Sequence, residues 1–262
     1  MTMFDVITSH VETTEGDRVV YDRMGEGPGV LFVQPAGQTR ATDPITPATL
    51  RALADAGRTA VVHDRVGRGD SAAAPPITLA RELAAIGAIL NEIGPAIVVG
   101  WSSGGAIALA AAARNASVRG VVLFELPFDG SGGAAGFLDG IRQRVRAGDA
   151  SAIVEYYMKD MPPQWLEQAK AGPGWTPLLQ MAPSFEADAE ALAWLESAPL
   201  AELLAPIGIP VLALTADDAQ PFMHDAAQAV ASATGGSAER IAGRHHGWDP
   251  DAMAARILRL GE

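Results

Sequence analysis

The sequence predicts an α/β fold in which a mostly parallel central sheet carries helices on both faces. Short apolar runs alternate with longer segments of helical spacing, an order typical of parallel α/β sheets. The apolar runs, such as GVLFVQ at 29–34 and AIVVG at 96–100, are hydrophobic throughout, which indicates strands buried on both faces. The 262 residues, 48% of them hydrophobic, are enough for a large core.

The individual elements follow from local patterns. Residues 5–12 and 18–23 predict an opening hairpin around the turn Glu15-Gly16-Asp17, and the helical segment 46–57 ends at a glycine. Strands are predicted at 29–34, 59–64, 96–100, 119–125, 209–215 and near 238–242, and those at 29–34 and 59–64 are expected to be buried. Further helices are predicted at 79–94, 103–115, 221–233 and 250–260.

The alternation stops in the middle of the chain. Residues 129–204 are helix-like, with Gly-rich and Pro-rich interruptions and no strand pattern. We therefore predict a core formed by 1–128 and 205–262, with 129–204 as a helical cap over one end of the sheet. Apolar cap side chains either line a pocket or pack the cap onto the sheet, and for each one packing is the commoner role. These side chains are Met158, Met161, Trp165, Trp175, Met181, Phe185 and Trp194.

Composition narrows the function classes. With 31 acidic and 19 basic residues, the net charge of −12 disfavours nucleic-acid and membrane-surface partners, although solubility alone also explains it. The sequence contains no cysteine, which excludes disulfides, Cys-ligated metals and a thiol nucleophile. The first residues lack the apolar segment of a secretory signal, and no run approaches the ~20 apolar residues of a membrane span, so we expect a cytoplasmic protein.

A serine lies where a strand turns sharply into a helix. Gly100-Trp101-Ser102-Ser103-Gly104 has the spacing G-x-S-x-G between a predicted strand and a predicted helix, the context in which this motif carries a nucleophile. The spacing selects Ser102 as the exposed hydroxyl. The backbone N–H of Ser103, at the helix N-terminus, can donate to a developing oxyanion. The alternative is a small-residue turn that only packs a helix close to the sheet.

A serine hydroxyl needs a base, and two adjacent histidines are well placed to supply it. His245 and His246 lie in AGRHHGWDP at 242–250, between the last predicted strand and the last helix. The chain order serine, acid, histidine favours a catalytic role over an exposed polar loop.

Five stretches, in this order, resemble the α/β-hydrolase superfamily, and more narrowly its small capped serine esterase-like members. LFVQPAG at 31–37 lies where the family has its oxyanion loop. HDRVGRGDS at 63–71 resembles the D-x-x-G-x-G-x-S turn, and GWSSGG at 100–105 matches the nucleophile elbow. VLALTADD at 211–218 resembles the strand before the acid loop, and GRHHG at 243–247 resembles the G-x-x-H loop. The resemblance covers nearly the whole chain and implies the α/β-hydrolase fold.

The resemblance also implies roles for single residues. The G-x-x-H pattern selects His246 as the base, with His245 as the alternative. Where the family usually reads His-Gly-x, this chain reads Gln34-Pro35-Ala36. The backbone N–H of Ala36 would be the second oxyanion donor, since Pro35 has no N–H and is not the donor position. Gln34 would hold the loop or touch the substrate.

Two carboxylates compete for the third catalytic role. Asp218 follows the strand that ends at Thr215, but the usual G-x-x-D spacing falls on Ala219. Glu125 ends the apolar strand at 119–125, where some relatives carry the acid. A glutamate buried there needs a partner, which is a protonated imidazole, Arg119 or a backbone N–H. The pattern favours Glu125 over Asp218.

The expected activity is that of a carboxylic ester hydrolase acting through an acyl-enzyme on a small, uncharged, hydrophobic ester. Trp101 and Phe128, next to catalytic positions, are candidate pocket residues together with Gln34. We expect a small-molecule substrate, no metal and no organic cofactor, and leave open a homodimer.

Other readings of the same residues remain open. A C–C hydrolase, a lyase or a cofactor-free perhydrolase would use the same site. Dehalogenation is disfavoured because those relatives carry a carboxylate where Ser102 stands. A ligand-binding module with vestigial catalysis also fits the unusual oxyanion loop, whereas a purely structural α/β protein leaves the serine, the glycines and the histidine without a role.

Overall fold

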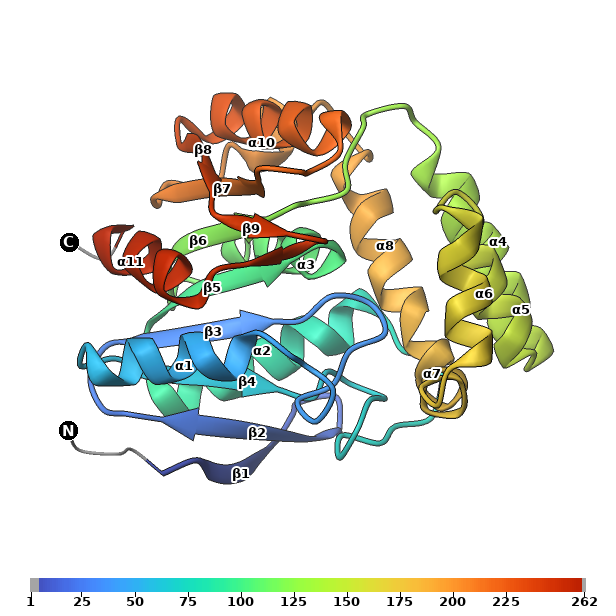
Figure 1. The fold of residues 1–262 in the computed structure, drawn as a ribbon, viewed down its shortest axis with the longest axis horizontal. Helices are drawn as coiled ribbons and strands as arrows, with labels where there is room; N and C mark the ends of the chain where they lie inside the picture. The colour runs from blue at the N-terminus through green and yellow to red at the C-terminus, as the bar shows by residue number, and fades with distance from the viewer. Residues whose placement is uncertain (1–4, 261–262) are drawn as a thin grey trace.

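The computed structural model describes residues 5–260 and confirms the expected fold class, a mostly parallel sheet with helices on both faces (Figure 1). The sheet order is β1-β2-β4-β3-β5-β6-β7-β8. β2 pairs antiparallel with β1 and with β4, and every other neighbouring pair in this sheet is parallel. The strands are β1 (Ile7–Glu12), β2 (Arg18–Met24), β3 (Gly29–Val33), β4 (Thr59–His63), β5 (Ala96–Trp101), β6 (Val118–Phe124), β7 (Val211–Ala216) and β8 (Ser237–Ile241).

Helices cover the two faces of the sheet because β3 to β7 are apolar on both sides. On one face, α1 (Thr46–Asp55) and α11 (Pro250–Leu260) bury Leu53 and Met253 against the strands. On the other face, α2 (Leu79–Ile93), α3 (Ser103–Ala112) and α10 (Pro221–Thr234) do the same, with Ile86, Ile107 and Val230 fully buried. The strands therefore separate two hydrophobic cores.

Between β6 and β7 the chain forms six α-helices and one short 3₁₀ helix (Ala182–Ser184). The α-helices are α4 (Ala134–Ala147), α5 (Ala150–Tyr157), α6 (Pro163–Ala171), α7 (Trp175–Met181), α8 (Phe185–Leu195) and α9 (Leu200–Leu204), and α4 to α8 lie at one end of the sheet (Figure 1). We call residues 129–204 the cap, the segment for which the sequence predicts a helical insertion. α8 joins the cap to the core, because it packs against both α4 and α3. α6, by contrast, contains no buried residue.

The loop after β8 forms a small hairpin that the sequence does not predict. β9 (Gly243–Arg244) pairs antiparallel with β10 (Gly247–Trp248), which leaves His245 and His246 as the two residues of its turn. Both histidines have positive φ, as the two central residues of a type I′ hairpin turn require. The core ranges expected from the sequence also include residues 1–4 and 261–262, which lie outside the described residues.

Among the helices of residues 5–260, none is both long enough and apolar enough to span a bilayer.

Replacing Ile86 tests the packing between α2 and the sheet. Ile86 is fully buried, so Ile86→Ala leaves a cavity and lowers the free energy of unfolding by about 2–5 kcal/mol. Ile7→Ala, at a β1 position that is 52% exposed, changes it by no more than about 0.5 kcal/mol. Chemical denaturation of both variants measures the difference, and equal stabilities would contradict this assignment of the core.

Candidate active site

Ser102 occupies a sharp turn between β5 and α3. Its backbone has φ 53° and ψ −127°, outside the conformations that non-glycine residues favour. The turn is held from both sides. The N–H of Ser102 donates to the carbonyl of Phe124 at 2.8 Å, and its carbonyl accepts from the N–H of Gly105 at 2.8 Å. Ser102 is half-buried as a residue, whereas its neighbours Trp101 and Ser103 are buried.

The flanking glycines allow α3 to approach the strands closely. A Cβ on Gly100 would lie 2.5 Å from the Cα of Gly105, and a Cβ on Gly104 would lie 2.4 Å from the carbonyl oxygen of Val33. Both distances are shorter than van der Waals contact allows. The steric reason that the sequence motif suggests for these glycines is therefore present in the fold.

His246 and Glu125 meet at the carboxyl end of the sheet. The Nδ1 atom of His246 forms a short hydrogen bond with Glu125 Oε2, and Glu125 Oε1 accepts from the backbone N–H of Ala216 at 3.0 Å. Glu125 is 2% exposed, so its carboxylate is desolvated and takes both partners inside the protein. This contact places the proton of the neutral ring on Nδ1 and leaves Nε2 as an acceptor.

Aromatic side chains hold the imidazole from the side. The ring of His246 lies 5.9 Å from that of Trp101 and 6.3 Å from that of Phe124, measured between centroids. Trp248, which follows the histidine turn, packs edge-on against both of these rings. Since Trp101 directly precedes Ser102, the same cluster brings the histidine loop to the serine turn.

Asp218 does not meet the imidazole. Its Oδ2 accepts the backbone N–H of His245 at 3.1 Å. Of the two acids considered from the sequence, the structure thus pairs Glu125 with the His246 ring and uses Asp218 to brace the turn. His245, the alternative base, is exposed in the same turn.

Strained backbone is concentrated at these residues. Within residues 5–260, the non-glycine residues with φ in the left-handed region are Ser102 at 53°, Glu125 at 49°, His245 at 56° and His246 at 61°. Such conformations cost about 1–3 kcal/mol each and persist only where the surroundings impose them. Strain of this kind clusters at active sites, where it fixes the direction of reactive side chains.

The loop after β3 carries the expected oxyanion donor. The N–H of Ala36 donates to the hydroxyl of Ser103 at 3.1 Å, so in this structure a side chain already accepts from it. Ser103 is the first residue of α3, and its own N–H therefore has no acceptor within the helix. The two N–H groups named from the sequence lie beside one another at the serine turn.

Two of the three expected pocket residues do not line an open pocket. Gln34 is 1% exposed, and its side-chain amide donates to Asp43 Oδ2 at 2.7 Å, a contact that fastens the loop to the segment before α1. Trp101 is 5% exposed and supports the histidine turn. Both side chains lie on the face of the sheet that α1 covers. The sequence motifs do not indicate this direction. Phe128 is half-buried and packs against the core on the other face.

A cavity of about 350 Å³ lies between the loop after β3 and the cap. Its lining combines Gly37 and Thr42 from the loop with cap residues, among them Leu178 and Met181. The remaining lining residues are Gln168, Ala169, Gly172, Gly174 and Pro177. No lining side chain is charged. Met181 is the one lining residue among the seven apolar cap residues singled out in the sequence.

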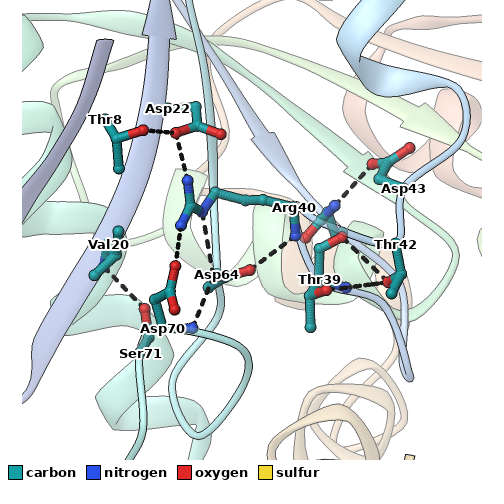
Figure 2. A network of polar contacts seen from close by, with 11 residues as sticks. Thr8, Val20, Asp22, Thr39, Arg40, Thr42, Asp43, Asp64, Asp70 and Ser71 are labelled. Atoms are coloured by element: carbon teal, nitrogen blue, oxygen red, sulfur yellow. Dashed lines mark hydrogen bonds and ion pairs between the residues drawn. The ribbon is translucent and has the colours of Figure 1, made fainter. Parts of the chain in front are cut away.

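Arg40 ties this loop to the rest of the core (Figure 2). Its guanidinium pairs with Asp22 of β2, with Asp64 at 3.2 Å and with Asp70 at 2.8 Å. Its backbone N–H donates to Asp64 Oδ1 at 2.8 Å. The loop after β3 is thereby fixed to β2 and to the turn after β4.

Four charged side chains are buried behind the serine turn, and the sequence analysis does not identify them as a group. Arg65, Arg68, Asp188 and Glu82 are each at most 1% exposed. Burial opposes ionisation of Asp188, yet Arg65 and Arg68 hold its pKa below the ordinary value. Burial also raises the pKa of Glu82, because the attraction of Arg65 does not fully offset the lost hydration. No sequence signal marks Asp188, an acid within the alanine-rich segment FEADAEALAW.

Residues 5–260 contain no cluster of three or more histidine and carboxylate side chains with the spacing of a metal site.

Replacing glycines tests the close contact at the serine turn. Gly104→Ala forces its Cβ against Val33, and we expect it to lower the free energy of unfolding by about 1–3 kcal/mol. Gly136→Ala, inside α4 with no atom within 4 Å of the new Cβ, raises it by about 0.5–1 kcal/mol. Thermal and chemical denaturation check both, and a neutral Gly104→Ala would show that the contact is not tight.

His63, at the end of β4, makes stability depend on pH. Burial, reinforced by Arg65, lowers its pKa from 6.5 to about 3. Below pH 6.5 the unfolded imidazole binds a proton that the folded one does not, so acid favours unfolding. At about 1.36 kcal/mol per pH unit, His63 removes about 2 kcal/mol of stability between pH 6.5 and 5.

The measurement is denaturant unfolding of the wild type and His63→Gln at both pH values. We expect the wild type to lose more stability than the variant, which carries no titrating group at this position. Equal losses would contradict the prediction that His63 binds a proton in the unfolded chain but not in the folded protein.

The comparisons with known proteins agree with this architecture. A model of the Alpha/beta hydrolase family matches residues 30–257. An alpha/beta hydrolase from Sphaerobacter thermophilus DSM 20745 is 27% identical, with a TM-score of 0.80 over 97% of this chain and 100% of that one. No curated protein matches the sequence.

Two more distant structures share the fold alone. The enol-lactonase from Burkholderia xenovorans LB400 is 18% identical, with a TM-score of 0.65 over 96% of this chain and 99% of that one. An epoxide hydrolase from an endophytic Streptomyces is 21% identical, with a TM-score of 0.68 over 97% of this chain and 95% of that one.

Proposed function

The chain belongs to the alpha/beta hydrolase family, and we propose that it is a serine hydrolase that cleaves small, uncharged, hydrophobic carboxylic esters. The observation that carries this proposal is the contact between His246 Nδ1 and the buried carboxylate of Glu125, beside the strained turn of Ser102. A nucleophile, a base and an acid that orients the base are the parts that acyl transfer requires.

Glu125, His246 and Ser102 have different roles in the proposed reaction. Glu125 fixes the tautomer of His246 and stabilises the imidazolium that forms. His246 Nε2 takes the proton of Ser102 as the serine oxygen attacks the ester carbonyl. The imidazolium then protonates the leaving alcohol, which leaves an acyl group on Ser102. Water, deprotonated by His246, releases the carboxylic acid and restores the serine.

The tetrahedral oxyanion would accept from the N–H groups of Ser103 and Ala36. The Ala36 N–H donates to the neutral hydroxyl of Ser103 in the structure. An anionic oxygen is a stronger acceptor than a hydroxyl, so the N–H would shift to the oxyanion as charge develops. Loss of one such donor typically costs ~3 kcal/mol of transition-state stabilisation.

The chemistry of the cavity supports an uncharged hydrophobic substrate. The cavity borders the oxyanion loop at Gly37, its lining contains no charged side chain, and neither Ser102 nor His246 belongs to that lining. A charged group that extends from the serine turn into the cavity would find no ion pair there. An aliphatic or aromatic group on the ester is the better match.

A binding module with vestigial catalysis explains the strain less well. Left-handed backbone at four non-glycine residues costs stability, and a protein that only binds a ligand has no need to retain it at the serine, the acid and the histidine together. A C–C hydrolase, a lyase or a perhydrolase on the same side chains remains the alternative within the enzyme class.

Replacing the two acids discriminates between the possible triads. Glu125→Gln keeps the size of the side chain but no longer fixes the imidazole tautomer, and we expect kcat on p-nitrophenyl butyrate to fall about 10⁴-fold. Asp218→Asn, the matched control, lowers it less than about tenfold, because Asp218 contacts only the backbone of His245.

Ser102→Ala supplies the reference for complete loss. It should abolish turnover without lowering the melting temperature, since the hydroxyl makes no structural contact that the fold requires. Near-wild-type activity in both acid variants would show that neither carboxylate completes the triad.

A further inference from the structure

A single peptide unit, between Pro35 and Ala36, is held at both ends by side chains that bind the same buried carboxylate, that of Asp188. Its carbonyl accepts from Arg68 Nη1 at 2.6 Å, and its N–H donates to Ser103 Oγ at 3.1 Å. Arg68 Nη2 donates to Asp188 Oδ2, and Ser103 Oγ donates to Asp188 Oδ1 at 2.7 Å. The peptide, the arginine, the aspartate and the serine thus form a closed ring of hydrogen bonds.

A second arginine extends the ring along the same loop. Arg65 Nη1 donates to the carbonyl of Gln34 at 3.0 Å and to Asp188 Oδ1 at 2.7 Å, while its Nε donates to Glu82 at 3.0 Å. Successive carbonyls of the oxyanion loop are therefore each bound by a guanidinium. Both guanidiniums share Asp188 as their counter-charge.

The cluster excludes water, which makes its directional contacts strong. Arg65 and Asp188 are fully buried, and Arg68 and Ser103 are 1% exposed. Hydrogen bonds between charged groups strengthen where the local dielectric constant is low. The plane of the 35–36 peptide cannot rotate without breaking at least one of them.

Stability alone does not account for these charges. A buried ion cluster is often no more stabilising than well-packed apolar side chains of the same volume. What the ions supply, and apolar groups cannot, is a fixed direction for the peptide. That peptide carries the Ala36 N–H, the donor that the proposed function assigns to the oxyanion.

We propose that Asp188, on cap helix α8, is a positioning residue for the oxyanion hole, acting through Arg68 and the Ser103 hydroxyl on the Pro35–Ala36 peptide. The inference rests on the proposed serine hydrolase function. The positive charge of Arg68 at the carbonyl polarises the peptide and makes its N–H a better donor. When the oxyanion forms, the N–H turns from the Ser103 hydroxyl to the anionic oxygen while Arg68 still holds the carbonyl.

The ring also connects the cap to the chemistry. Asp188 lies 85 positions from Ser103 along the chain, and α8 packs against α3, the helix that Ser103 begins. A shift of α8 would move the carboxylate and, with it, both contacts of the peptide. The cap would then affect the rate of the chemical step as well as substrate binding.

The decisive comparison uses two buried serines of the same cluster. Ser103→Ala removes the hydroxyl that holds the Ala36 N–H. Ser184→Ala, the matched control, removes a hydroxyl that accepts from Arg68 Nε at 2.8 Å but does not touch the peptide. Both substitutions delete one neutral group, so neither leaves an unpaired buried charge. Asp188→Asn is the third variant and removes the shared counter-charge.

Three quantities are measured for each variant. Hydrolysis of p-nitrophenyl butyrate gives kcat and KM separately. Inhibition by a trifluoromethyl ketone reports on the oxyanion, because the adduct of the ketone with a serine carries one. The third is the hydrogen-exchange rate of the Ala36 amide in the free protein, a readout that does not depend on catalytic activity.

For Ser103→Ala we expect kcat to fall about tenfold with KM nearly unchanged, and ketone inhibition to weaken in parallel. Exchange of the Ala36 amide should accelerate about tenfold. Ser184→Ala should leave all of these within about twofold of the wild type, because the peptide keeps both of its contacts. Asp188→Asn, if it folds, should exceed Ser103→Ala in every effect.

Either of two results overturns the positioning role of Asp188. The first is an equal loss of kcat in Ser103→Ala and Ser184→Ala, and the second is an unchanged Ala36 exchange rate in Ser103→Ala. If the wild type hydrolyses no ester, the proposed function fails, and the exchange rates alone still decide whether the ring orients the peptide. Should Asp188→Asn fail to fold, the two serine variants carry the test.

Discussion

The left-handed backbone of Ser102 is the constraint on which the rest of the site depends. It turns the chain between β5 and α3 so sharply that α3 must pass within contact distance of the strands, which only glycines at 100 and 104 permit. Hydrogen bonds from the Ser102 N–H to Phe124 and from the Gly105 N–H to Ser102 hold the turn. The unfavourable conformation is thus imposed by a rigid frame that holds Ser102 at the end of β5.

The same frame places Glu125 and His246, the residues proposed to activate the Ser102 hydroxyl. Phe124, which accepts from the Ser102 N–H, is followed by Glu125, whose own φ of 49° turns its carboxylate toward the histidine hairpin. Parallel strands bring their carboxyl ends to one edge, so residues that are far apart in the chain meet there. Strand order, local strain and one buried acid–imidazole contact together bring Ser102, Glu125 and His246 to this edge.

Regular features of the fold could be predicted because they follow from local patterns. Apolar runs located β3 to β7 within a few residues, and G-x-S-x-G between strand and helix located the turn at Ser102. The sequence does not decide between Glu125 and Asp218 because both follow a strand at the same edge, and the structure shows that Glu125 contacts the imidazole.

Contacts between distant segments that no sequence motif marks could not be predicted. The turn at His245 and His246 lacks the Asn-Gly or Asp-Gly pair that usually marks such hairpins. The sequence predicts that Gln34 holds the loop or touches the substrate, and the direction of its side chain depends on its hydrogen bond to Asp43. Asp188 meets Arg65 from 123 positions away, and neither residue type nor spacing indicates that an acid in an alanine-rich helix is buried.

The most direct test of a nucleophilic Ser102 is covalent labelling of the wild-type protein with a fluorophosphonate, followed by mass spectrometry of its peptides. We expect one phosphonate adduct, on the peptide that contains Ser102 and on that residue, with much slower labelling when His246 is replaced by alanine. Absence of an adduct on the folded protein, or attachment at another serine such as Ser103, would contradict this prediction.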